Sequence, residues 1–216
     1  MSNESTVVTE RHFEYLAART LREDAFLVDL KAAANEAGIP PINISPEQAA
    51  FMAILLRLHR AREVVEVGTL AGYSAIAMAR ALPADGRVRT IELNDAYADF
   101  AHEWIARSDV ADRIELIRGA GADVLPTMND GSTDACFLDA DKKSYPGYLD
   151  ASLRILRPGG LVMVDNAFAF GQLFDDAPTD PEATAVCAFN DYMARRDGVT
   201  SVIVPLGDGL WVGVCD

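Results

Sequence analysis

Carboxylate and amide side chains follow two apolar segments in the second half of the chain. Asp139 comes directly after the apolar run 135–138, and Asp165 and Asn166 follow the run 161–164. If these runs are neighbouring parallel strands, their carboxyl ends lie about 5 Å apart at one edge of a sheet. Asp139, Asp165 and Asn166 can then share one cation, and hard oxygen ligands favour Mg²⁺, Mn²⁺ or Ca²⁺. Such a chelate would bind a vicinal diol, whereas the alternative is that these residues only cap helices and form turns.

Lys142 lies three residues beyond Asp139. A lysine beside a metal ion and a buried pocket can have a lowered pKa and act as a base. The sequence therefore makes Lys142 a candidate catalytic base, with an ordinary surface lysine as the alternative.

A glycine-bearing loop joins a predicted strand at 64–67 to a predicted helix at 73–82. Gly68 lets a ligand approach backbone N–H groups at the carboxyl end of the strand, where open parallel sheets bind ligands. Glu66 stands just before this glycine, and a carboxylate there suits a cationic or hydroxyl-bearing ligand. The loop is not G-x-G-x-x-G, because Leu70 occupies the middle position, so a dinucleotide is less favoured. A tight turn with no ligand is the other reading.

Glu92 stands at the end of the predicted strand 87–93. An acidic residue in this position can accept hydrogen bonds from both ribose hydroxyls of an adenosine. Together with the glycine loop, Glu92 predicts an adenosine-containing cofactor, either NAD or S-adenosylmethionine. The strand-end residues Asp139 and Asp165 decide between these two cofactors.

Strands and helices alternate from residue 62 onward, which predicts an α/β fold with a parallel sheet covered on both faces. After a predicted helix at 181–196, only residues 205–209 separate the predicted strands 199–204 and 210–214. So short a link cannot make a parallel crossover, so these two strands should form an antiparallel hairpin. The other predicted strands are 114–117, 135–138 and 161–164, and the other predicted helices are 95–107, 122–128 and 145–156.

Helical periodicity also marks the region that precedes the sheet. Residues 10–38 are predicted to be helical, with Gly38 as the stop. A second helix starts where Ser45 can act as the N-cap, Pro46 fits the first helical position and Gln48 completes a capping box.

Composition limits the classes of protein and of partner. The 216 residues suit one domain, and 50% of them are hydrophobic, so a sizeable core can form. The formal net charge of −14 argues against a nucleic-acid partner and against an anionic membrane surface. Three unpaired-looking cysteines argue against a disulfide scaffold, and the polar, acidic start lacks the features of a signal peptide. We therefore expect a cytoplasmic protein that has no membrane segment.

The motifs taken together resemble a known family, the cation-dependent O-methyltransferases. This group includes the catechol and caffeoyl-CoA O-methyltransferases and their bacterial relatives. The resemblance runs from about Ile42 to Gly209 and rests on five segments: Glu66–Ser74, Ile91-Glu92, Leu138–Lys142, Val164–Asn166 and Leu206–Leu210.

The resemblance implies a Rossmann-like class I methyltransferase fold, with a seven-stranded, mostly parallel sheet that ends in the antiparallel hairpin. Residues 1–216 would form one methyltransferase domain, with N-terminal helices in 1–60 and a catalytic core in 61–216. S-adenosylmethionine would be the methyl donor, and the acceptor a small phenol with two adjacent hydroxyl groups. The N-terminal helices help to form a dimer in relatives, so we expect a homodimer.

The resemblance also assigns roles by position. Lys142 would be the base, and the metal ligands would be Asp139, Asp165 and Asn166. The residues expected at the cofactor are Ile44, Glu66, Gly68, Thr69, Ser74, Glu92, Ala120, Gly121 and Asp139. A bound divalent cation would lower the pKa of one acceptor hydroxyl, and the phenolate would attack the methyl group in line with the departing sulfur.

The chain departs from the family in the segment that should border the acceptor. Relatives usually carry tryptophan at the position of Ala169, and the plant caffeoyl-CoA enzymes carry asparagine at that of Phe170. The acidic stretch 175–180 is either a surface loop or a lid, and an acidic mouth would discourage anionic acceptors such as CoA esters. The alternatives are a tRNA hydroxyuridine O-methyltransferase, an NAD-dependent oxidoreductase and a non-catalytic adenosine-binding module.

Overall fold

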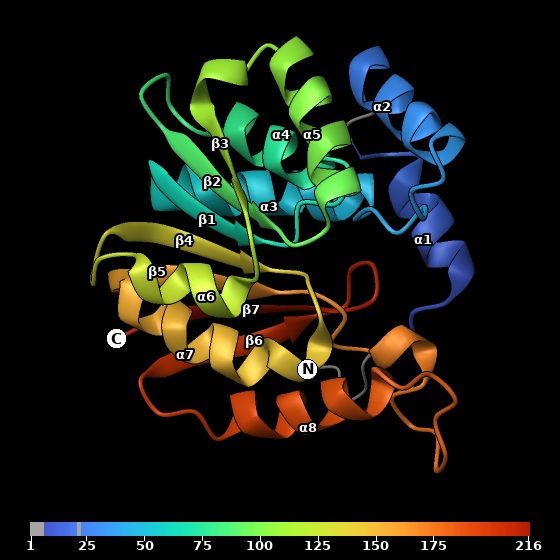
Figure 1. The fold of residues 1–216 in the computed structure, drawn as a ribbon. Coiled ribbons are helices and arrows are strands. Elements are labelled where there is room, and N and C mark those ends of the chain that lie inside the picture. The colour runs from blue at the N-terminus through green and yellow to red at the C-terminus, as the bar shows by residue number, and fades with distance from the viewer. Residues whose placement is uncertain (1–6, 21–22) are drawn as a thin grey trace.

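A seven-stranded sheet forms the centre of the computed structural model, which describes residues 7–20 and 23–216 (Figure 1). The strand order is β3-β2-β1-β4-β5-β7-β6. The first five strands run parallel, and β7 is antiparallel to both β5 and β6. The strands are β1 (Glu63–Val67), β2 (Arg87–Glu92), β3 (Ile114–Arg118), β4 (Thr133–Leu138), β5 (Leu156–Val164), β6 (Val199–Val204) and β7 (Leu210–Cys215).

Helices cover both faces of this sheet. Alternate residues of the central strands point to opposite sides, so Phe137 belongs to one buried cluster and Leu138 to the other. The first cluster includes side chains from α2 (Ala25–Glu36), α3 (Pro46–His59), α4 (Tyr73–Ala81) and α5 (Asp95–Arg107). The second cluster includes side chains from α7 (Tyr145–Ile155) and α8 (Ala183–Ala194), and the short helix α6 (Gly121–Val124) lies on the same side (Figure 1).

The sheet confirms the expected fold class and the C-terminal hairpin. The predicted neighbours also pair, because Leu138 of β4 lies opposite Val164 of β5. Since β1 has β2 on one side and β4 on the other, the strand order reverses between β1 and β4. Ligands of open α/β sheets bind at such a switch point, beyond the carboxyl ends of the strands.

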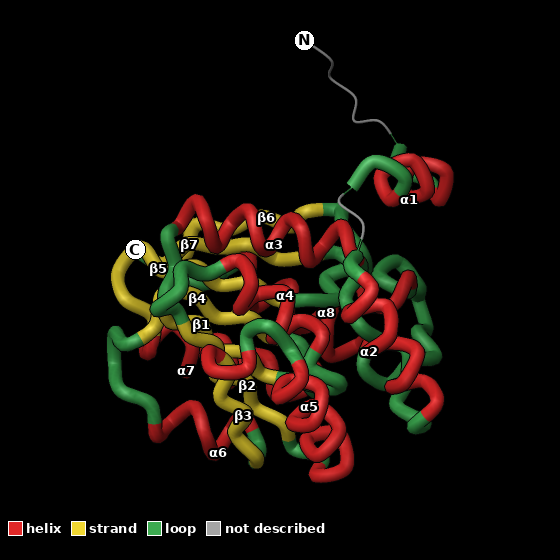
Figure 2. The backbone as a smooth tube through the Cα atoms, turned by 90° about the horizontal axis from the view of Figure 1, so that it is seen from above, coloured by secondary structure: helices red, strands yellow, loops and turns green. Residues whose placement is uncertain are grey.

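The region 10–38, predicted to be helical, contains two helices. The structure has α1 (Glu10–Ala17) and then α2, which starts where the Asp24 side chain accepts a hydrogen bond from the Leu27 N–H at 3.0 Å. Asp24 is therefore the N-cap of α2. Residues 21–22 of the predicted helical region lie outside the described residues. All eight residues of α1 are exposed, and Figure 2 shows this helix standing apart from the layers around the sheet.

Helix α3 begins as predicted, but one of its expected roles is different. Ser45 accepts a hydrogen bond from the Gln48 N–H at 3.2 Å, and Pro46 occupies the first turn. The Gln48 side chain, which the sequence suggested would complete a capping box, is instead 1% exposed and turned into the protein. The helix predicted at 122–128 is shorter than expected. It consists of α6 and one turn of 3₁₀ helix that contains Pro126, which cannot donate a helical hydrogen bond.

Candidate active site at the carboxyl edge of the sheet

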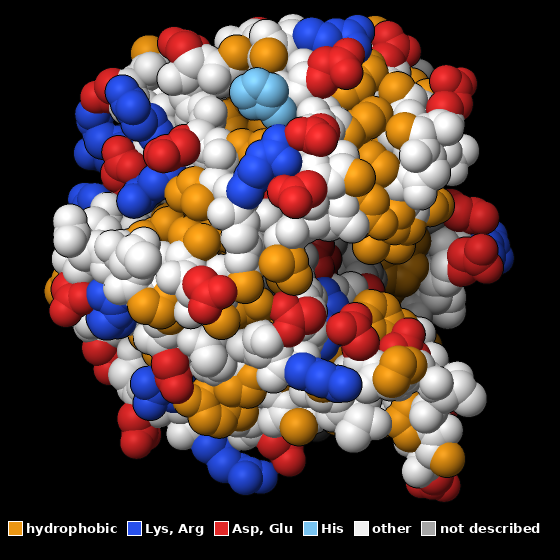
Figure 3. All heavy atoms as spheres, in the orientation of Figure 1, with side chains coloured by type: hydrophobic (Ala, Val, Ile, Leu, Met, Phe, Trp, Pro, Cys, Tyr) orange, Lys and Arg blue, Asp and Glu red, His pale blue; other side chains and the backbone are white. Residues whose placement is uncertain are grey.

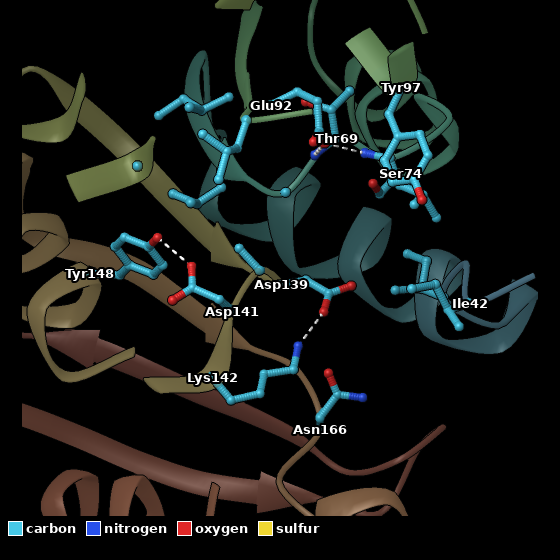
Figure 4. Close-up of a pocket in the computed structure, with 18 of the residues that line it drawn as sticks. Ile42, Thr69, Ser74, Glu92, Tyr97, Asp139, Asp141, Lys142, Tyr148 and Asn166 are labelled. Carbon is cyan, nitrogen blue, oxygen red and sulfur yellow. Dashed lines mark hydrogen bonds and ion pairs between the residues drawn. The ribbon is translucent and has the colours of Figure 1, made fainter. Parts of the chain in front are cut away.

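A cavity of about 360 Å³ opens at the carboxyl ends of β1, β2 and β4, where the strand order reverses. Figure 3 shows a hollow with acidic side chains inside it and beside it. Figure 4 shows side chains from the β1–α4 loop, β2 and the β4–α7 loop pointing toward this space. Ten of the predicted site residues line the cavity: Ile44, Gly68, Thr69, Ser74, Glu92, Ala120, Gly121, Asp139, Lys142 and Asn166. Glu66 and Asp165 lie behind the lining, and both are buried.

The glycine loop approaches the β4 strand end more closely than any side chain would allow. Gly68 has φ of +102°, and a Cβ atom added there would collide with the backbone carbonyl of Asp139. Gly72, at φ of +89°, is the N-cap of α4. Only glycine combines these conformations with so small a volume, so the loop can pack directly against the β4 strand end at the edge of the cavity.

Glu92 braces this loop as well as lining the cavity. Its Oε2 accepts hydrogen bonds from the N–H groups of Leu70 at 2.8 Å and Thr69 at 3.2 Å, and its Oε1 accepts one from Asn94 at 2.8 Å. The side chain is 8% exposed. Because a carboxylate oxygen can accept more than one hydrogen bond, Glu92 can hold the loop and still accept from a ligand hydroxyl.

Glu66 is a fully buried carboxyl group beneath the loop. Its Oε2 accepts from the Thr90 hydroxyl at 2.6 Å, and the Thr69 and Thr90 hydroxyls lie 2.5 Å apart. Burial raises the pKa of Glu66 to about 8, although nearby hydroxyl groups oppose this shift. Oε1 has no hydrogen-bond partner among the described residues. A buried acceptor of this kind fits a cationic group of a ligand, which would favour the ionised form.

Lys142 is held in place by two partners. Its Nζ donates to Asp139 Oδ1 at 2.8 Å and to the Tyr145 hydroxyl at 2.7 Å, and the residue is 5% exposed. Burial raises the pKa of Tyr145 well above its usual value, so this hydroxyl stays neutral and accepts from the ammonium group. The dashed line in Figure 4 marks the pair of Lys142 with Asp139, which leaves Asp139 Oδ2 for another ligand.

Asp165 and Asn166 follow β5 directly, beside the end of β4. Asp165 is 6% exposed, and its Oδ1 is buried without a hydrogen-bond partner among the described residues. Burial, followed by the charge of Asp139, raises the pKa of Asp165 to about 7. Asn166 adds an amide oxygen that points toward Lys142 (Figure 4). Asp139 and Asn166 line the cavity and Asp165 lies directly behind them, and two carboxylates with an amide form a donor set suited to a hard cation.

Several lining residues were not identified from the sequence. Asp141 lies within the segment Leu138–Lys142, and its Oδ1 accepts from the Tyr148 hydroxyl at 2.6 Å. Glu182 lines the cavity from the residue that precedes α8, and its Oε1 accepts from the Lys142 N–H at 3.4 Å. No spacing in the sequence connects Tyr148 or Glu182 to the strand ends, so only tertiary packing reveals them.

Ala169 and Phe170, the two residues after β5 at which the chain departs from the family, lie in different surroundings. Phe170 lines the cavity, as expected for a residue beside the acceptor. Ala169 is fully buried and packs with Ala183 and Val186 near the start of α8, away from the lining. Ala169, for which the resemblance implied a tryptophan in relatives, therefore belongs to a separate apolar cluster.

Within residues 7–20 and 23–216, no group of three or more His, Cys, Asp or Glu side chains is placed to hold a metal ion. The predicted cation site contributes only two such side chains, since its third member is an amide. No helix in the described part of the chain is long and apolar enough to cross a membrane.

The reversed strand order, the glycine loop and the antiparallel last pair define the class of protein, a Rossmann-like methyltransferase. The model of the O-methyltransferase family matches residues 17–214. The chain belongs to this O-methyltransferase family.

Similar proteins agree with this assignment. The catechol O-methyltransferase of Niastella koreensis is 36% identical over 187 residues, which cover 85% of this chain and 84% of that protein. The crystal structure of the Bacillus cereus O-methyltransferase in complex with SAH is 30% identical with a TM-score of 0.85, over 94% of this chain and 96% of the other. The SAM complex of TomG from Streptomyces achromogenes is 33% identical with a TM-score of 0.82, over 94% of both chains.

Proposed function

We propose that the protein transfers a methyl group from S-adenosylmethionine to one hydroxyl of a small catechol-like acceptor, with a divalent cation, Mg²⁺ in the first place. The observation that carries this proposal is the convergence of Asp139, Lys142 and Asn166 beside a glycine loop in one cavity. The catechol O-methyltransferase relative and the structures in complex with SAM and SAH support the same reaction.

The methyl donor would occupy the end of the cavity beside the glycine loop and Glu92. S-adenosylmethionine carries a cationic amino group, a sulfonium group and an adenosine. Glu92, which lines the cavity, would accept from the ribose hydroxyls, and the buried carboxyl group of Glu66, directly behind the lining, would attract the amino group by its charge. Ala120 and Gly121 would contact the adenine. A Cβ added at Gly121 would lie 2.6 Å from a Val67 methyl group and 2.9 Å from the Tyr148 ring, so this wall has no room for a side chain.

The cation fits the strand-end residues. Asp139, Asp165 and Asn166 would hold it, and its charge would lower the pKa of an acceptor hydroxyl beside it. The buried, unpartnered Oδ1 of Asp165 is the observation that favours such an ion, because a buried carboxylate needs a compensating partner.

The chain's own residues then have separate tasks. Lys142, fixed by Asp139 and Tyr145, would release the proton of its ammonium group to solvent and then, as the neutral amine, accept the proton of the acceptor hydroxyl at Nζ. The glycine loop would orient the methyl donor, and Phe170 and Ile42 would bound the acceptor with apolar surface. Most of the rate enhancement would come from position and charge, since the donor is already activated.

The first test is methyl transfer from labelled S-adenosylmethionine to caffeic acid, dopamine and 3,4-dihydroxybenzoate. We expect turnover with Mg²⁺, loss with EDTA and recovery when Mg²⁺ is added back. Turnover that EDTA leaves unchanged would contradict the metal requirement. If calorimetry shows that S-adenosylmethionine binds and no catechol is methylated, the acceptor belongs to another class, such as a tRNA hydroxyuridine. The net charge of −14 makes RNA the weaker choice.

The charge of the acceptor gives a second prediction. Four carboxylates, Glu92, Asp139, Asp141 and Glu182, line the described cavity with Lys142. The first three are engaged at 2.6–2.8 Å, whereas Glu182 accepts only the 3.4 Å hydrogen bond. We therefore expect kcat/KM for dopamine to exceed that for 3,4-dihydroxybenzoate by about tenfold, since the two acceptors differ by two unit charges and each charge at about 6 Å contributes roughly 0.7 kcal/mol in water.

Glu182→Gln should lower the ratio of kcat/KM for dopamine to kcat/KM for 3,4-dihydroxybenzoate by about fivefold, which corresponds to roughly 1 kcal/mol. Asp112→Asn is the control, because Asp112 is exposed and lies just before β3, at the end of the sheet opposite the cavity, and it should change the ratio less than twofold. An unchanged ratio in Glu182→Gln would remove Glu182 as a determinant of acceptor charge.

We also propose a homodimer. The exposed side chains of α1 include Phe13, Tyr15 and Leu16, which are 36%, 58% and 38% accessible. An amphipathic helix with this much exposed apolar surface is typical of an interaction element. Light scattering at micromolar concentration should give twice the chain mass of 23.3 kDa, and a monomeric mass would contradict the proposal.

A further inference from the structure

The turn between β6 and β7 lies against the loop that follows β5. Because β7 runs antiparallel to β5, the turn 205–209 returns to the same edge of the sheet as the candidate ligands. Backbone hydrogen bonds join the two segments, from the Ala167 N–H to the Gly209 carbonyl at 2.8 Å and from the Phe168 N–H to the Asp208 carbonyl at 2.7 Å. Residues 40 positions apart in the chain are thereby fixed to each other.

Asp208 adds a side-chain clamp to these backbone contacts. Its Oδ2 accepts from the Asn166 Nδ2 at 3.2 Å and from the Phe170 N–H at 2.9 Å. The first bond engages the nitrogen of the Asn166 amide, so the amide oxygen is the atom that faces the cavity. Figure 4 shows this oxygen on the side of Lys142 and Asp139.

The loop that Asp208 holds is strained. Asn166, Ala169 and Phe170 have φ of 66°, 54° and 57°, which are left-handed conformations that non-glycine residues rarely adopt. Such backbone persists only where surrounding contacts fix it. Asp208 contacts two of these three residues through a single oxygen atom, so its removal should let the loop and the Asn166 amide adopt other orientations.

We propose that Asp208 is a positioning residue, which fixes the Asn166 amide oxygen toward the divalent cation and orders the Phe170 wall. This inference rests on the proposed function, because it assigns Asp208 to the outer shell of the proposed cation site. It also gives a role to the segment Leu206–Leu210, which the sequence marked but to which no chemistry had been assigned. Outer-shell partners commonly change metal affinity by 10- to 100-fold when they are removed.

The test measures Mn²⁺ affinity by electron paramagnetic resonance, with S-adenosylmethionine present, in the full-length protein and its variants. Asp208→Ala should weaken Mn²⁺ binding by about 10- to 100-fold. Asp208→Asn should remain within about fivefold of wild type, since its amide oxygen can replace Oδ2. The control Asp176→Ala removes an exposed carboxylate that lies outside the lining and should change the affinity less than twofold.

Two readouts separate positioning from a general loss of structure. The affinity for S-adenosylmethionine, measured by calorimetry, should change less than threefold in Asp208→Ala. In a double-mutant cycle with Asn166→Ala, the effect of Asp208→Ala on Mn²⁺ affinity should disappear, because Asp208 acts through that amide.

The outcomes are distinct. Unchanged Mn²⁺ affinity in Asp208→Ala, or parallel loss of Mn²⁺ and S-adenosylmethionine, would overturn the positioning role and leave the proposed function standing. Effects of Asp208→Ala and Asn166→Ala that add independently would also overturn it. A wild-type protein that binds no Mn²⁺ would instead remove the metal from the proposed function, and this inference with it.

Discussion

Asp165→Ala should reduce methyl transfer by about 100- to 1,000-fold, because a cation that stabilises the reacting oxygen contributes several kcal/mol and each 1.36 kcal/mol is a factor of ten. Affinity for S-adenosylmethionine should stay within threefold of wild type, since Asp165 lies at the end of β5, away from the glycine loop and Glu92. Radiolabel transfer and calorimetry on the same preparation measure the two quantities.

The stability of a second variant, Asp165→Asn, provides an internal check. Asp165 is a buried carboxyl group whose ionised form is disfavoured in the protein without metal. Asp165→Asn, which keeps the shape and removes the charge, should therefore unfold at a temperature no lower than wild type in EDTA. Asp112→Ala, an exposed substitution at the opposite end of the sheet next to β3, should leave both transfer and affinity unchanged. Joint loss of transfer, cofactor binding and stability in Asp165→Asn would show that the carboxylate is structural.

Gly68→Ala should lower the free energy of unfolding by about 3 kcal/mol or more, which combines left-handed strain with overpacking. The added methyl group would meet the Asp139 carbonyl, whose residue is fixed by its own N–H bond to the Val67 carbonyl at 2.9 Å. The loop or the β4 strand end must therefore move, and S-adenosylmethionine affinity should fall at least tenfold.

Gly38→Ala is the matched control for this substitution. Gly38 also has a positive φ, of +78°, but no atom lies within 4 Å of a Cβ added there. Its cost should be conformational strain alone, about 1 kcal/mol, with no effect on cofactor affinity. Urea unfolding of both variants, compared at equal m-values, measures the difference. Equal losses in the two variants would mean that the contact with Asp139 does not matter.

The sequence predicted the parts of the fold that depend on local pattern. Alternating strands and helices defined the sheet, and the five-residue link 205–209 required a hairpin whatever the rest of the chain did. Asp139, Asp165 and Asn166 could be grouped because they end two strands that pair, as Leu138 and Val164 show.

Contacts between distant segments could not be predicted in the same way. Gln48 has the residue type and spacing of a capping box, yet its side chain is buried in the protein interior. The boundary between the two helices in the region 10–38 could not be placed, because helical periodicity does not indicate that Asp24 caps the second helix. Tyr148 and Glu182 reach the cavity from segments whose spacing carries no signal. Asp208 lies in a segment that the sequence did mark, but its contacts with Asn166 and Phe170 depend on packing that only the folded chain has.

The position of β7 in the sheet affects the order in which parts of the site can fold during synthesis. This strand is the last of the seven in the chain, yet it inserts between β5 and β6 and carries one side of the turn that holds Asn166. Chains grow on the ribosome from the amino terminus, and earlier segments fold first. A nascent chain can therefore assemble β1 to β5 and the glycine loop while the edge of β5 is still open. The cavity acquires its final wall only after residues 205–215 have emerged, so the adenosine half of the site can form during synthesis before the half that would hold the acceptor.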